Sequence, residues 1–194
     1  MNINNIRTLF LLATIGFAFL SSIPLLSMVL PEVKGETFSE IWLLDSENQT
    51  SFHPIAAKAG MPNTVFVGVS NHVGTAQSYL VKLKIRNETQ DIPSINGSMA
   101  SNLPSLYDYQ IFVADGGTKK LLVNLELLDI SVSQNTLNVK NIVVKDIPFP
   151  VNASTEYDDE ASGYFFQLFF ELWRYDIELN KFVYDNRFVT LWIN

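Results

Sequence analysis

The alternation of apolar and polar residues beyond Gly35 limits the fold of this chain more than any other feature. In the stretch Thr64–Arg86, TVFVGVSNHVGTAQSYLVKLKIR, Val65, Val67 and Val69 share one strand face. After a short polar centre the alternation resumes, with Val81 on the apolar side. Successive side chains of a strand point to opposite faces. The pattern therefore predicts half-buried antiparallel strands, and no amphipathic helix is expected beyond Gly35.

Further segments have the same period and are separated by turn signals. The expected strands are Glu40–Leu44, Tyr109–Ala114, Leu121–Asp129, Thr136–Val144, Tyr164–Tyr175 and Phe182–Ile193. The sequences DGGT at Asp115–Thr118 and DIELN at Asp176–Asn180 are typical of turns. Many strands without intervening helices predict a mainly β chain with an antiparallel β-sandwich, and a closed barrel of similar size is the alternative. The region Asp91–Tyr107 is expected to be a long loop.

The polar centre SNHVG, at Ser70–Gly74, raises the question of a reactive turn. Gly68 and Ser70 resemble part of a nucleophile elbow, but the second glycine of that motif is absent. We therefore expect the tip of a β-hairpin, with Asn71 and Gly74 at positive φ and His72 exposed. No catalytic constellation is predicted anywhere in the sequence, so the chain is not expected to be an enzyme.

The amino-terminal stretch Thr8–Leu30 has 23 residues and no charge. At about 1.5 Å rise per residue a helix of this length spans roughly 34 Å, enough for a bilayer core. With Arg7 before it, the positive-inside tendency puts residues 1–7 in the cytoplasm, a transmembrane anchor at 8–30 in the lipid bilayer, and residues 36–194 outside the cell membrane. The alternative is a signal peptide cleaved at Val33–Gly35.

Composition restricts the partners and the chemistry. The net charge is −7 and no cluster of Lys and Arg forms a basic stripe, so nucleic-acid binding is not expected. The chain has no cysteine, which excludes disulfides, thiolate metal sites and Cys nucleophiles; no cofactor or metal site is predicted. Four sequons, all beyond the apolar stretch, are glycosylation candidates: Asn48, Asn87, Asn96 and Asn152.

The carboxy-terminal stretch YFFQLFFELWRYD, Tyr164–Asp176, is the most aromatic part of the chain. One strand face is entirely apolar, and the other mixes aromatic and polar residues. Either both faces are partly buried, or the second face is an exposed aromatic strip that binds a partner or stacks on sugars. The interaction candidates are Phe169, Trp173, Tyr175 and Trp192.

The stretch Phe38–Ile85, FSEIWLLDSENQTSFHPIAAKAGMPNTVFVGVSNHVGTAQSYLVKLKI, resembles the exported domain of the archaeal membrane proteins grouped as DUF1616. The matching positions are Phe38, Glu40, Trp42, Leu43, Leu44, His53, Pro54, Gly60, Pro62, Val65, Val67, Gly68, Val69, Asn71, His72 and Tyr79. Val73 stands where that group frequently has glutamate. The segments FELWRYD and RFVTLWIN resemble its closing hairpin. The resemblance implies an archaeal cell envelope location and an immunoglobulin-like sandwich, but no activity.

Together these observations predict a membrane-anchored, extracytoplasmic β-sandwich that acts by binding. It would be an envelope glycoprotein or an accessory subunit of a membrane or S-layer-associated complex, with an envelope or membrane protein as its partner. The alternative is a carbohydrate-binding or glycan-processing accessory module, in which Trp173, Tyr175 and Trp192 stack on a glycan.

Overall fold

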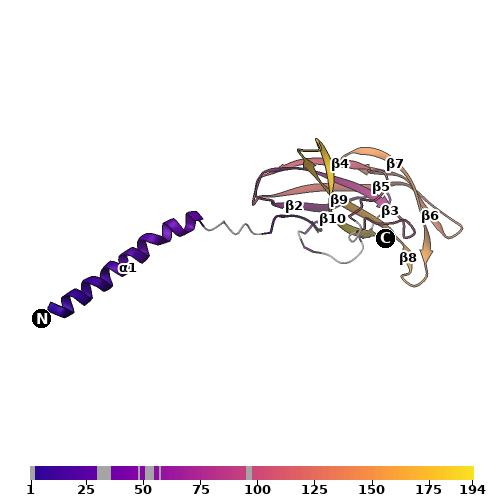
Figure 1. Cartoon of the computed structure of the whole chain (residues 1–194). Helices are drawn as coiled ribbons and strands as arrows, with labels where there is room; N and C mark the ends of the chain where they lie inside the picture. The colour runs from indigo at the N-terminus through magenta and orange to yellow at the C-terminus, as the bar shows by residue number, and fades with distance from the viewer. Residues whose placement is uncertain (1–2, 30–35, 48, 51–54, 57, 95–97) are drawn as a thin grey trace. The chain divides into compact units, whose positions relative to one another are not determined.

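The computed structural model describes residues 3–29, 36–47, 49–50, 55–56, 58–94 and 98–194, and it divides into two units, Met1–Gly35 and Glu36–Asn194 (Figure 1). The first unit contains the helix α1, Ile3–Val29. Its side chains Leu9, Phe10 and Phe17 are largely exposed. Among the described residues, no helix combines the length and the apolar character that a membrane crossing requires. The expected cleavage site at Val33–Gly35 lies outside the described residues.

The second unit is built from antiparallel strands, which confirms the mainly β prediction. The strands are β1 (Phe38–Leu44), β2 (Pro62–His72), β3 (Gln77–Arg86), β4 (Tyr107–Val113), β5 (Thr118–Ser133), β6 (Thr136–Val144), β7 (Ile147–Asp158), β8 (Gly163–Tyr164), β9 (Phe166–Asp176) and β10 (Lys181–Ile193). They form a six-stranded sheet, β1-β2-β5-β6-β7-β8, and a four-stranded sheet, β10-β9-β3-β4 (Figure 1). The predicted loop Asp91–Tyr107 precedes and reaches the start of β4.

The core is a single cluster that draws alternate residues from both sheets. The valines at 65, 67 and 69 of β2 contribute from the six-stranded sheet, and the inward residues of β3 and β9 contribute from the four-stranded sheet. The fully buried members of β3 and β9 are Tyr79, Val81, Leu83, Phe166, Leu168, Phe170 and Leu172. The two sheets thus face one another across a shared apolar interior, which is the main favourable term in the folding of such a unit.

The predicted hairpin at Thr64–Arg86 is wrong. β2 pairs with β1 and β5, whereas β3 pairs with β4 and β9, so the two strands belong to different sheets. Both strands have one apolar face, and both faces point into the core from opposite sides. Alternation reports which face of a strand is buried and does not identify the strand beside it, so a chain that crosses between sheets has the same pattern as a hairpin.

The buried side chain of Asn71 holds the connection between β2 and β3 in place through hydrogen bonds. Its Nδ2 donates to the carbonyl oxygens of Thr75 (2.8 Å) and Val113 (3.1 Å), and its Oδ1 accepts from the hydroxyl of Tyr79 (3.0 Å). The side chain is fully buried. Asn71 is not among the described residues with positive φ, contrary to prediction, whereas Gly74 has a φ of 86°. His72 is exposed, as predicted.

The strand β7 was not predicted, because Pro148 and Pro150 interrupt its sequence. A proline cannot donate a hydrogen bond to a neighbouring strand, and it is tolerated at the edge of a sheet. β7 pairs with β6 along one side, and on its other side only Tyr157 and Asp158 pair, with β8. The prolines therefore lie where β7 has no second neighbour among the named strands.

Candidate functional site

The candidate site is the hairpin of β9 and β10, which pair antiparallel over most of their length. The inner face of β9 belongs to the core, as its fully buried leucines show. Its outer face contains the residues that the sequence singled out: Gln167, Phe169, Glu171, Trp173 and Tyr175. Because the two faces have different surroundings, the outer face decides what this hairpin contacts.

The middle of the outer face is covered. Glu171 is fully buried and its Oε2 lies 3.0 Å from Nζ of Lys84, which is almost completely buried. Both charged groups also bind the peptide of Ser101, in the loop before β4: Nζ donates to its carbonyl oxygen (2.6 Å) and Oε1 accepts from its N–H (2.7 Å). Phe169, on the same face, is fully buried. Phe169 is therefore not available to a partner in this structure.

The two tryptophans of the predicted strip already have cations over their rings. Lys82 Nζ lies 4.8 Å from the ring centroid of Trp173, and Arg86 Cζ lies 5.6 Å from that of Trp192. Trp192 also meets Phe165 edge to face, with centroids 6.5 Å apart. Such cation–π contacts are favourable, so a sugar that stacks on the same ring face has to displace the cation. This lessens the case for sugar stacking on this hairpin.

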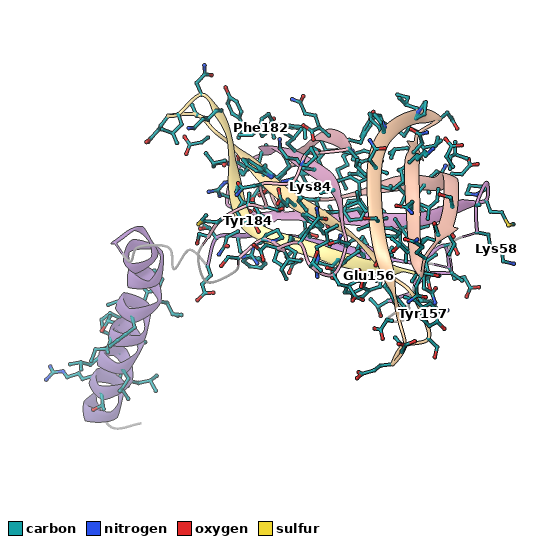
Figure 2. The ribbon with its side chains drawn as sticks, turned by 90° about the vertical axis from the view of Figure 1, so that its right-hand side faces the viewer. Lys58, Lys84, Glu156, Tyr157, Phe182 and Tyr184 are labelled. Atoms are coloured by element: carbon teal, nitrogen blue, oxygen red, sulfur yellow. The ribbon has the colours of Figure 1, made fainter. Side chains whose placement is uncertain are left out.

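The far half of the hairpin is different, because it ends in exposed apolar side chains. Trp173 pairs with Tyr184 (centroids 5.8 Å apart) and Tyr175 with Phe182 (5.3 Å). In the turn beyond them Ile177 is 83% exposed and Leu179 is 58% exposed. Figure 2 shows Phe182 near the projecting end of the hairpin and Tyr184 nearer the body of the sheet. We call these residues the hairpin surface: Trp173, Tyr175, Ile177, Leu179, Phe182 and Tyr184.

A polar cluster lies beside the hairpin surface. Arg174 Nε is 3.7 Å from Oδ1 of Asp185, and the buried hydroxyl of Tyr184 has no hydrogen-bond partner among the described residues. Burial, together with the nearby charges of Glu171 and Asp185, raises the pKa of Tyr184 to about 12. Burial also raises the pKa of Tyr79, although its hydrogen bond with Ser39 opposes that shift. Both phenols therefore release their protons at a higher pH than an exposed tyrosine does.

Two of the four sequons fall within the described residues. The Nδ2 atom of Asn87 donates to the carbonyl oxygen of Ser154 (3.0 Å), and its Oδ1 accepts from the N–H of Thr89 (3.1 Å). Asn152 is exposed on β7 with a φ of 45°. Asn48 and Asn96 lie outside the described residues. Asn152 therefore offers its amide to solvent, whereas that of Asn87 already forms a hydrogen bond.

The residues that resembled a nucleophile elbow have structural contacts. The Oγ of Ser70 lies 3.0 Å from Oγ1 of Thr118 on the neighbouring strand. The ring of His72 lies 4.8 Å from that of Phe38. Within the described part of the chain, no group of three or more His, Asp or Glu residues is placed to hold a metal ion. Ser70 thus forms a contact between neighbouring strands near the end of β2.

The sequence did not single out Ile177, Leu179, Phe182 and Tyr184. A signal for two of them was present: Ile177 and Leu179 are aliphatic residues inside an otherwise polar turn. Their exposure depends on how far the hairpin extends from the core, which the pattern does not report.

Comparison with known proteins adds no further constraint: no protein-family model matches this chain, and no curated protein matches it significantly.

Proposed function

We propose that this chain is a non-catalytic binding module, anchored in the cell membrane with its β domain outside, which holds an envelope or membrane protein through the hairpin surface. The observation that carries the proposal is the exposure of Ile177 and Leu179 beside two cross-strand aromatic pairs. Aromatic residues with an adjoining apolar contact are enriched at the centres of protein interfaces.

An immunoglobulin-like sandwich is the fold we propose for the second unit. In the immunoglobulin arrangement strands A, B and E adjoin in one sheet and C, F and G in the other. The orders β1-β2-β5 and β3-β9-β10 correspond to these two sets. The strands β6, β7 and β8 then form an extension between the strands that correspond to E and F, which are β5 and β9. This correspondence supports the sandwich. Membership of the DUF1616 group remains a proposal that rests on the sequence resemblance over Phe38–Ile85 and in the closing hairpin.

The anchor and the outside location rest on the sequence alone, on the uncharged stretch Thr8–Leu30. The helix α1, which contains most of that stretch, does not meet the criteria for a membrane span within the described residues. The sequons at Asn87 and Asn152 agree with an exported glycoprotein. Extraction of native membranes with alkaline carbonate tests the anchor: the full chain is expected to stay in the membrane pellet. Release into the supernatant, or an intact mass that lacks the first 35 residues or so, would contradict it.

Co-purification tests the binding surface. The full-length chain is isolated from mildly solubilised native membranes beside an Ile177→Asp, Leu179→Asp double variant. We expect a protein partner in stoichiometric amount with the native chain and a loss of about tenfold or more with the variant. Val132→Asp is the matched control, since Val132 is 58% exposed near the end of β5. Equal recovery of the partner from all three chains would contradict the assignment of the hairpin surface.

A further inference from the structure

A hollow of about 480 Å³ lies where the edge strands β1 and β10 of the two sheets meet. Its lining is Glu40, Ile41 and Trp42 from β1 and Asn186, Arg187 and Phe188 from β10. The volume is within the range of small-molecule sites, about 300–1,000 Å³. The hollow shares no residue with the hairpin surface, so its function is a separate question.

Trp42 is held in place by the strand beside it. Gly68 is its register partner on β2, and a Cβ atom built at Gly68 would lie 2.0 Å from Cε2 and from Cζ2 of the indole. The six-membered ring therefore occupies the space above Gly68 that a side chain would otherwise fill. A glycine inside a strand often marks such a close approach. The indole of Trp42, a residue of the lining, therefore has little freedom to rotate.

The opposite wall is shaped by an irregularity in β10. The register with β9 shifts between Tyr184 and Arg187, and Asn186 has a φ of 54°. A bulge of this kind turns side chains away from their regular direction and is frequent beside functional sites. Asn186 and Arg187, the residues at this irregularity, line the hollow together with Glu40.

From this geometry we propose that the hollow between β1 and β10 binds a neutral saccharide, with Trp42 as the stacking wall and Glu40 and Arg187 as hydrogen-bonding groups. A sugar ring has an apolar C–H face that packs on an aromatic ring and hydroxyl groups at its edge that need both donors and acceptors. The carboxylate of Glu40 supplies acceptors and the guanidinium of Arg187 supplies donors. The negative charge of Glu40 and the positive charge of Arg187 offset one another. This favours an uncharged ligand over an ion.

Titration calorimetry on the full-length chain tests this site. The chain is kept in a detergent without a sugar head group, and cellohexaose, chitohexaose and mannohexaose are each added. We expect at least one of them to bind, and Trp42→Ala to weaken that binding about tenfold or more. Arg187→Ala, a change of an exposed residue that leaves the core intact, is expected to weaken it at least severalfold. Phe112→Ala is the control, because Phe112 is 61% exposed on β4, at the opposite edge of its sheet.

The outcomes separate this inference from the proposed function. Binding that is lost in Trp42→Ala and Arg187→Ala, and kept in Phe112→Ala, supports the saccharide site even if no protein partner is found for the hairpin surface. Absence of heat with all three hexasaccharides, or equal binding by all the variants, overturns it. A partner that co-purifies through Ile177 and Leu179 would stand in either case.

Discussion

Gly68 lies inside β2, where a glycine costs about 0.5–1 kcal/mol relative to alanine and leaves no side chain to pack. The reason for it is the indole of Trp42, which fills the space of the missing side chain. Lys84 and Glu171 also depend on one another. Each is a buried charged residue, and its burial is tolerated only because the other supplies the opposite charge. At both places one residue type is required by another far away in the sequence.

We expect Gly68→Ala to lower the free energy of unfolding by about 1–3 kcal/mol, since the new methyl group overlaps the ring of Trp42. Urea unfolding measures the change. In the double variant Gly68→Ala, Trp42→Ala the cost of the alanine at position 68 should largely disappear, because no ring remains to clash. If Gly68→Ala stabilises the native chain, the close approach of the indole is not a constraint.

Lys84→Met is expected to cost about 3–5 kcal/mol, because it leaves Glu171 buried without its cation. Lys82→Met is the matched control on the same strand. Its pair with Asp108 spans 3.5 Å and both side chains are partly exposed, so a loss below about 1 kcal/mol is expected. Chemical denaturation of both variants decides the matter, and equal costs would show that burial of the Lys84 pair has no energetic consequence.

At the scale of elements, the chain uses three kinds of connection. Asn71 holds the crossing from β2 to β3, Lys84 and Glu171 hold the long loop before β4, and the turns that join β5 to β6 and β6 to β7 are short. In those short turns both central residues have positive φ, for example Gln134 at 49° and Asn135 at 65°. That geometry is the type I′ turn, whose twist matches that of paired strands.

Replacing Gln134 and Asn135 together by Asn and Gly should therefore stabilise the protein, by about 0.5–1 kcal/mol, because these residues adopt positive φ at lower cost. Gln134→Val is the opposite test, since a β-branched residue is strained at a φ of 49°. Urea midpoints should move in opposite directions for the two variants. A shift in the same direction would contradict the turn assignment.

For the whole molecule, the buried tyrosine hydroxyls make the free energy of unfolding depend on pH in the alkaline range. Burial raises the pKa of Tyr79, Tyr109 and Tyr184 above the ordinary value of 10.0. The unfolded chain then releases these protons at a lower pH than the folded chain does. The stabilisation is fully present below pH 10 or so and is lost as the pH rises through the folded pKa values.

We therefore expect the free energy of unfolding to fall steadily above about pH 10, by at most about 1.4 kcal/mol per pH unit for each tyrosine. Urea unfolding from about pH 8 to about pH 11 measures the slope. Tyr184→Phe should make the slope shallower at little cost in stability, because its buried hydroxyl has no partner to lose. An identical slope in Tyr184→Phe would exclude this residue as a source.

The sequence by itself determined the strand content and the inward face of most strands, as for Val65, Val67 and Val69. These depend on local alternation, which is written into consecutive residues. Only the tertiary structure decided which strands adjoin, that Asn71 is buried, and that Phe169 is covered while Ile177 is exposed. The strand beside a given strand, and the residues that cover one of its faces, are distant from it in sequence. Ser101, for example, covers Glu171. Their choice depends on how the whole core packs, and no local pattern records it.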